Sequence, residues 1–146
     1  GGVFEFTRVT HVLGSACAVA YNHKTRTEDW EAFAKLVLDA SYEACFLAAL
    51  ENRDRHPDAP GAKKLFLTQL GGDAFGNRQT WILDAIKRAV TKFKHFDLNV
   101  YLVCYGTIDS GLQQLKQELE AEIAMLDGAS LSLRSTLSQG ESDMFS

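Results

Sequence analysis

The run from residue 70 to residue 77, Leu-Gly-Gly-Asp-Ala-Phe-Gly-Asn, has the composition of a ligand-binding turn. It follows an apolar stretch at 65–70 and precedes an amphipathic pattern at 78–93, so we expect it to join a strand to a helix. Glycines permit a tight turn, and their missing side chains let the backbone approach a ligand. Backbone amides gathered at a helix N-terminus attract anions. The run therefore predicts a site at 71–76 that suits an anion such as a diphosphate, with Asn77 as the helix N-cap.

This run matches neither of the common nucleotide-binding motifs. It has no Gly-Lys-Ser/Thr sequence of the P-loop, and its glycines do not have the spacing of the dinucleotide fingerprint. A tight strand-to-helix connection that binds nothing is therefore an alternative interpretation of the same residues.

Two carboxylates are candidate catalytic groups, Asp73 within the run and Glu5 near the start of the chain. A carboxylate beside a scissile bond polarises a water molecule or assists a leaving group. The alternative for each is an exposed acid without a role. Tyr105 ends a predicted strand, where its ring would either stack on a base or ribose or simply pack. His11 lies in the middle of a predicted strand, which favours a hydrogen-bonded core histidine over a base.

The elements that position these residues alternate between strand and helix. Hydrophobic patterning predicts strands at 9–13, 65–70 and 100–105, and helices at 30–51, 78–93 and 111–126. This order is typical of an α/β fold, and we expect a three-layer α/β/α sandwich with a mostly parallel, mixed sheet. Ligands of such sheets lie beyond the carboxyl ends of the strands. We therefore expect the site among Gly14, the glycine run and residues 105–109.

Two helix faces carry charge patterns. The helix at 30–51 has a narrow polar stripe, which predicts a helix covered on most of its sides; the stripe consists of Glu31, Lys35, Asp39 and Glu43. The helix at 78–93 carries a basic cluster that predicts a solvated face; the cluster consists of Lys87, Arg88, Lys92 and Lys94.

The length of 146 residues fits one domain. We expect a domain at 1–127 and a flexible, serine-rich tail at 128–146, because the tail contains few large apolar residues. Residues 52–62 contain both prolines and predict a surface loop.

Charge and cysteine usage exclude several classes of partner. A net charge of −4 argues against binding to nucleic acid or to an anionic membrane. No apolar run approaches the roughly 20 residues that span a bilayer, and no secretory signal is visible. Cys17, Cys45 and Cys104 lie in apolar surroundings, which predicts reduced thiols in an intracellular protein, cytoplasmic or nuclear. There is no Cys-x-x-Cys pair and the histidines are scattered, so we expect neither a metal site nor a cofactor.

Several segments, taken in order, resemble the macrodomain family. Residues 8–14, Arg-Val-Thr-His-Val-Leu-Gly, are similar to a family strand, and the helix with Ala40, Ala44 and Leu50 is similar to the helix that follows it. The apolar strand and glycine run at 65–76 resemble the family's G-x-G-x-F-G loop, with Phe75 and Gly76 matching its end. The match spans 1–106 and looks closest to the branch that acts on ADP-ribosylated arginine.

This resemblance implies ADP-ribose as ligand and a mono-ADP-ribosylated protein as partner, with hydrolysis of ADP-ribose from arginine as the activity. It places the glycine loop on the diphosphate and proximal ribose, and Asp73 and Glu5 as catalytic acids. The expected ligand-binding residues are Gly14, Gly71, Gly72, Ala74, Phe75, Gly76, Asn77 and Tyr105. The start of the chain, Gly-Gly-Val, resembles a remnant of the family's first glycine loop, so the family's front strands and adenine-binding acid have no counterpart here.

Two other functions fit the same sequence. One is a reader, in which the same pocket recognises ADP-ribosylated proteins without hydrolysing them. The other is a structural module with an empty glycine turn, in which the helix at 111–126 serves as a partner interface.

Overall fold

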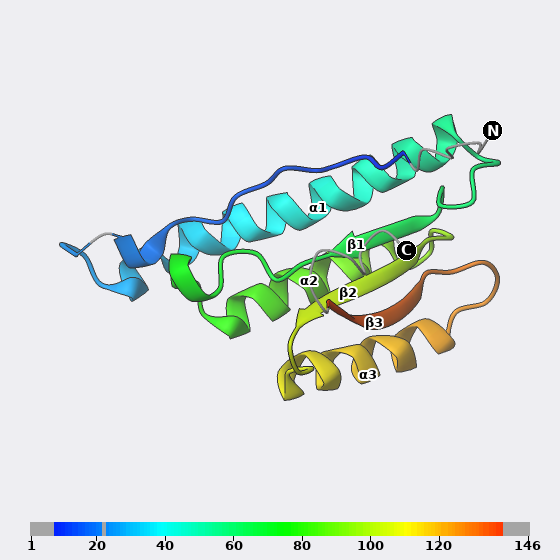
Figure 1. Cartoon of the computed structure of the whole chain (residues 1–146). Helices are drawn as coiled ribbons and strands as arrows, with labels where there is room; N and C mark the ends of the chain where they lie inside the picture. Colours follow the sequence, from blue (N-terminus) through cyan, green and yellow to red (C-terminus); the bar gives the residue numbers. More distant parts are fainter. Residues whose placement is uncertain (1–7, 22, 139–146) are drawn as a thin grey trace.

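The computed structural model describes residues 8–21 and 23–138, which form an α/β fold (Figure 1). Helices and strands alternate along the described chain; they are α1 Glu31–Arg55, β1 Lys64–Leu67, α2 Gln79–Phe93, β2 Asn99–Tyr105, α3 Ser110–Ala124 and β3 Ser132–Ser138. Short 3-10 turns accompany them; these are η1 Val19–Tyr21, η2 Thr27–Trp30 and η3 Asp73–Phe75.

The three strands form one parallel sheet in the order β1-β2-β3. Leu65 pairs with Val100, and Val100 pairs with Leu133. Each step from one strand to the next crosses over through a helix, and both steps proceed in the same direction across the sheet. Right-handed crossovers then place α2 and α3 on the same face. α1 packs against α2 and β1, so it also belongs to this helical layer.

Burial alternates along β1 and in the first half of β2, where one face of the sheet is covered by helices, whereas Val103 of β2 is buried on the other face. The residues that face the helices are buried in one core; they are Leu65, Leu67, Val100, Leu102, Cys104 and Leu133. On the opposite face, Phe66 is 52% exposed and stacks on Tyr101 with ring centroids 4.8 Å apart. The three-layer sandwich is therefore not confirmed, because within residues 8–21 and 23–138 the helices pack on one face only.

Two residues of the polar stripe of α1 pair with α2 at the surface, and the other two, Glu31 and Lys35, pair with each other. Asp39 accepts a hydrogen bond from Arg88 at 2.9 Å, and Glu43 accepts one from Lys92 at 2.7 Å. Phe46 stacks on Phe93 beneath these pairs, with ring centroids 5.0 Å apart. The expectation that the helix is covered on most sides is wrong, because the charges pair between helices and an apolar face remains exposed.

The predicted strand at 9–13 is also wrong. Residues 8–18 have no regular secondary structure and run alongside α1 (Figure 1). Thr10 Oγ1 donates to Asn52 Oδ1 at 3.0 Å, and Gly14 lies against Ser41. His11 is exposed, so it is not a core histidine. The alternation of β-branched residues was a local signal, but the segment pairs with no described strand and packs on a helix instead.

The expectation of a flexible tail from residue 128 is wrong for β3. This strand pairs with β2 along its whole length, from Asn99 opposite Ser132 to Tyr105 opposite Ser138. Leu131 and Leu133 are 1% and 6% exposed and anchor it in the core. Because the sheet already supplies a hydrogen-bonding edge, two leucines suffice to hold a segment of otherwise small polar residues. Residues 139–146 of the predicted tail lie outside the described residues.

Candidate functional site

A pocket of about 240 Å³ lies at the carboxyl ends of β1 and β2, where a parallel sheet is expected to bind its ligand. Its walls come from the loop after β1, the first turn of α2 and the end of β2; the lining residues are Gln69, Gly72, Asp73, Asn77, Gln79, Val103 and Tyr105. The structure thus brings together four predicted site residues, Gly72, Asp73, Asn77 and Tyr105. Their binding of a ligand stays a prediction.

The glycine loop satisfies part of its own hydrogen-bonding capacity. The amides of Phe75, Gly76 and Asn77 donate to the carbonyls of Gly72, Asp73 and Gly71, respectively, at 3.0, 3.2 and 3.0 Å. These three amides are therefore not available to an anion. The amides of residues 71–74 make no hydrogen bond to other described residues, so the part of the loop that can receive a diphosphate is its first half.

Two of the three loop glycines make room for the chain itself. A Cβ atom on Gly71 would lie 2.2 Å from Ala16 Cβ, and one on Gly76 would lie 2.8 Å from Ala20 Cβ. Both glycines also have positive φ angles, +74° and +70°. Gly72 differs, because its φ is −64° and a Cβ there would meet only Ile82 Cδ1, at 3.9 Å. Gly72 is therefore the glycine that opens onto the pocket.

Asn77 is not the N-cap of α2, as the sequence had predicted; Arg78 occupies that position and makes no side-chain cap. The side chain of Asn77 is buried, and Nδ2 donates to the carbonyls of Cys17 at 2.8 Å and Gly71 at 2.9 Å. These two acceptors fix the amide orientation, because a flipped amide would set its oxygen against two carbonyls. Oδ1 is buried without a partner among the described residues.

Asp73 lies in the left-handed region of backbone space, with a φ of +33°. A conformation of this kind costs a residue other than glycine about 1–3 kcal/mol and is frequent at functional sites. The side chain is exposed at the pocket, and it makes no ion pair with the described residues. The carboxylate is therefore free to interact with a ligand or a water molecule in the pocket.

A chain of side-chain hydrogen bonds crosses the same edge of the sheet. Gln79 Nε2 donates to Gln69 Oε1 at 3.0 Å and to Asp109 Oδ2 at 2.8 Å. Asp109 is the N-cap of α3, since Oδ2 accepts from the amide of Leu112 at 3.0 Å. The chain links the end of β1 to the starts of α2 and α3. Sequence analysis missed both glutamines, and their only signal is that they flank the glycine run.

Tyr42 of α1 holds the start of the glycine loop through two hydrogen bonds. Its hydroxyl donates to the carbonyl of Thr68 at 2.8 Å and accepts from the amide of Leu70 at 2.9 Å. The side chain is 1% exposed, and burial raises the pKa of the Tyr42 phenol well above its usual range. This residue therefore remains a neutral structural group that holds the loop against α1.

The remaining predicted site residues do not line the pocket. Gly14 lies against α1, and Ala74 is exposed on the loop. Phe75 packs on the core and meets Tyr21 edge to face, with ring centroids 6.1 Å apart. Glu5 lies outside the described residues. The helix α3, expected in one interpretation to serve as a partner interface, packs its apolar face on the core through Leu112, Leu115 and Leu119.

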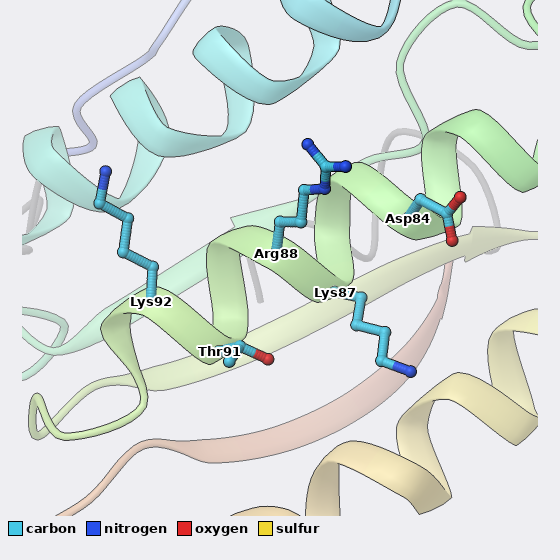
Figure 2. Close-up of a pocket in the computed structure, with 5 residues that line it drawn as sticks. All are labelled: Asp84, Lys87, Arg88, Thr91 and Lys92. Carbon is cyan, nitrogen blue, oxygen red and sulfur yellow. The ribbon is translucent and has the colours of Figure 1, made fainter.

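A larger and more open groove of about 560 Å³ lies over α2 (Figure 2). Asp84, Lys87, Arg88, Thr91 and Lys92 line it. In Figure 2 the side chains of Arg88 and Lys92 point toward α1 and that of Lys87 points toward α3, where Lys87 meets Glu118 at 3.1 Å. Each cation has a carboxylate partner, so the groove has no uncompensated positive charge for an anion.

Cys45 and Cys104 do not have the properties of reactive thiols, and no metal site is formed among the described residues. Burial raises the pKa of the Cys45 thiol, and burial and the nearby Asp109 carboxylate raise the pKa of the Cys104 thiol. Both groups are therefore weaker nucleophiles than a free cysteine. Over residues 8–21 and 23–138, no three His, Cys, Asp or Glu side chains gather in a way that could hold a metal ion.

Comparison of the chain with protein-family models, with curated proteins and with solved structures finds no match. The macrodomain resemblance therefore rests on the sequence motifs alone. Among the helices that the structure describes, none is both long and apolar enough to cross a membrane.

Proposed function

We propose that this chain binds ADP-ribose at the carboxyl edge of its parallel sheet. The observation that carries the proposal is the pocket that joins Gly72, Asp73 and Asn77 of the glycine run to Tyr105 of β2. Two independent features of the sequence, the glycine run and the end of the third predicted strand, meet there. ADP-ribose itself comes from the macrodomain resemblance.

The size and chemistry of the pocket suit one part of this ligand. A volume of about 240 Å³ lies below the roughly 300–1,000 Å³ of pockets for drug-sized molecules. A ribose fits this description, because its hydroxyls form hydrogen bonds with polar side chains such as Gln69 and Gln79 and its ring packs on an aromatic side chain such as Tyr105. The diphosphate then lies over the free amides of residues 71–74. Asp73 turns to the ribose, because a carboxylate facing a diphosphate would be repelled.

The proposal also includes a more specific fold, which is a macrodomain-like three-layer sandwich. Parallel sheets are almost always covered on both faces. The face that carries Phe66 and Tyr101 is the one that a second helical layer would cover, and Phe66 is 52% exposed there.

The binding proposal is tested by calorimetric titration of the full chain with ADP-ribose. Gly72→Val places methyl groups in the pocket without straining the backbone, because φ at residue 72 is already negative. We expect it to weaken binding about tenfold or more, as overpacking costs about 1–3 kcal/mol. Gly61→Val is the matched control, because a Cβ at Gly61 meets nothing within 4 Å. Absence of heat with the parent chain at millimolar ADP-ribose would remove the proposal.

Hydrolysis of ADP-ribosyl-arginine is the second candidate, and the strained, unpaired Asp73 favours it over a reader. The carboxylate takes a proton from water as the water oxygen bonds to the anomeric carbon. The bond between that carbon and the arginine nitrogen breaks, and its electron pair leaves with the guanidine. The guanidine then takes up the proton, which restores the carboxylate.

Release of ADP-ribose from an arginine-modified peptide separates the enzyme from the reader. Asparagine tolerates left-handed backbone angles, so Asp73→Asn keeps the loop conformation while removing the charge. For an enzyme, we expect turnover to fall by about 10²–10⁴-fold with little change in binding of free ADP-ribose. Asp58→Asn, at an exposed acid in the loop after α1, is the control. A parent chain that binds but releases nothing is a reader.

A further inference from the structure

The hydrogen-bond chain from Asp109 through Gln79 to Gln69 can run in only one direction. An ionised Asp109 has no hydrogen to donate, so Gln79 must turn its amide nitrogen toward the carboxylate, as it does at 2.8 Å. The second hydrogen of the same nitrogen is donated to Gln69, which therefore presents its amide oxygen, at 3.0 Å. One carboxylate thus fixes the orientation of both amides, whereas two glutamines by themselves could exchange the roles of donor and acceptor.

The unused ends of this chain belong to two residues that line the pocket. Gln69 Nε2 and Gln79 Oε1 form no hydrogen bond with any residue of the described ranges, 8–21 and 23–138. They offer a ligand one donor and one acceptor. Neighbouring hydroxyl groups satisfy both, because a hydroxyl accepts and donates. The oxygens of a diphosphate only accept, and they would be repelled by the oxygen of Gln79.

We propose that Asp109 is a positioning residue, which acts through Gln79 and Gln69 to fit the pocket to neighbouring hydroxyls of a sugar. The inference rests on the proposed binding of ADP-ribose, and it assigns the terminal ribose, which carries the anomeric carbon, to the glutamine pair. Gln69 Nε2 donates to one hydroxyl, and Gln79 Oε1 accepts from the next. The diphosphate remains over the free amides of residues 71–74.

The same oxygen of Asp109 also caps α3, so the test must separate capping from positioning. Oδ2 accepts from the amide of Leu112 at 3.0 Å. Serine and asparagine cap helices about as well as aspartate does. Asparagine can place its oxygen where Oδ2 lies and so accept from both Leu112 and Gln79. The serine oxygen lies one bond closer to the backbone, so it caps the helix without reaching Gln79. Asp109→Ser therefore removes only the positioning contact, and Asp109→Asn is its matched control.

The side-chain amide signals in the NMR spectrum of the free chain test the orientation without a ligand. Both amide protons of Gln79 are hydrogen-bonded, whereas those of Gln69 have no partner among the described residues. We therefore expect slower exchange with water at Gln79 than at Gln69. This protection should persist in Asp109→Asn and be lost in Asp109→Ser, while the three melting temperatures stay nearly equal because each residue caps α3.

Calorimetric titration with ADP-ribose tests recognition. Asp109→Ser should weaken binding about three- to tenfold, which is the range of one hydrogen bond, and Asp109→Asn should bind like the parent chain. Gln69→Met keeps the length of the side chain, lacks the donor and should show a similar loss. The double variant Asp109→Ser, Gln69→Met should lose no more than either single variant, because both substitutions interrupt one chain of contacts.

A sugar analogue tests which part of the ligand the glutamine pair contacts. ADP-ribose without the 2-hydroxyl of its terminal ribose should bind the parent chain more weakly, and Asp109→Ser should weaken its binding less than it weakens that of ADP-ribose.

The inference is overturned by rapid exchange at Gln79 in the parent chain, by equal binding of ADP-ribose to the parent and Asp109→Ser, or by additive losses in the double variant. An equal loss in Asp109→Asn and Asp109→Ser would overturn it too, because it would assign the effect to charge rather than to orientation. A parent chain that does not bind ADP-ribose removes the proposed function, and the ribose assignment with it. The exchange rates still decide in that case whether Asp109 fixes the glutamine pair, so the two failures are distinguishable.

Discussion

Replacing Gly71 with alanine should separate the two reasons for a glycine in the loop. An alanine there must adopt a φ of +74°, and its Cβ would lie 2.2 Å from Ala16 Cβ and 2.7 Å from Asn77 Nδ2. The backbone strain costs about 1–2 kcal/mol. The clash pushes residues 16–20 off the loop, and a lost hydrogen bond from Asn77 to Cys17 adds about 1–3 kcal/mol.

The expected loss of stability for Gly71→Ala is therefore about 2–5 kcal/mol. For a chain of this size, each kcal/mol lowers the melting temperature by about 2–4 °C, so we expect a fall of roughly 5–15 °C. Thermal unfolding followed by circular dichroism measures it, and urea unfolding gives the free energy directly.

Gly106→Ala is the matched control for the strain. Its φ is +75°, nearly the same as that of Gly71, but a Cβ there meets nothing within 4 Å. It should lose only the strain energy of about 1–2 kcal/mol. Equal losses for the two variants would refute the reasoning, because they would show that the segment at 16–20 does not pack on the loop.

Three further substitutions test the fold. Leu133→Ala should lower the free energy of unfolding by about 2–5 kcal/mol, since Leu133 is 6% exposed in β3. An unchanged free energy of unfolding in urea would show that β3 does not pack on the core. Tyr42→Phe should cost about 1–3 kcal/mol. Because the folded pKa of Tyr42 is raised, the parent chain should lose stability as pH rises above about 10, whereas the variant should lack this loss. Arg88→Ala should cost less than about 1 kcal/mol, since its pair with Asp39 is at the surface; a larger loss would contradict this.

The elements that the sequence predicts best are those with a strong local period. The apolar face of α2 repeats every three to four residues, and the helix begins and ends within a residue of its expected bounds, at Gln79 and Phe93. β2 and α3 are similar cases. The strand β3 was missed because its stability comes from pairing with β2, a non-local interaction that leaves only Leu131 and Leu133 as a signal.

The polar stripe of α1 shows a second limit of periodicity. Asp39 and Glu43 mark one face of the helix, but the sequence does not say whether that face meets water or an oppositely charged helix. Here it meets Arg88 and Lys92 of α2. Hydrophobic periodicity locates faces, whereas the partner of each face depends on how the helices pack.

The place of the candidate site followed from topology, because the carboxyl ends of parallel strands meet at one edge. The roles of its residues did not follow. An asparagine just before a helix can be an N-cap, or it can be buried and donate to two carbonyls, as Asn77 does. The sequence is the same in both cases, and only the packing of residues 16–20 against the loop distinguishes them. Gln69 and Gln79 give no signal beyond flanking the glycine run, and their contact with each other appears only in the folded chain.

The glycine run carries the most consequential ambiguity, because glycine is required equally where a ligand approaches and where the chain approaches itself. Gly71 and Gly76 belong to the second case, since Ala16 and Ala20 occupy the space that their side chains would need. Gly72 alone lines the pocket, with an ordinary φ and open space beside it. Loss of ligand binding on substitution of Gly71 would therefore report a disturbed loop, whereas the same loss at Gly72 with an unchanged melting temperature would report contact with the ligand.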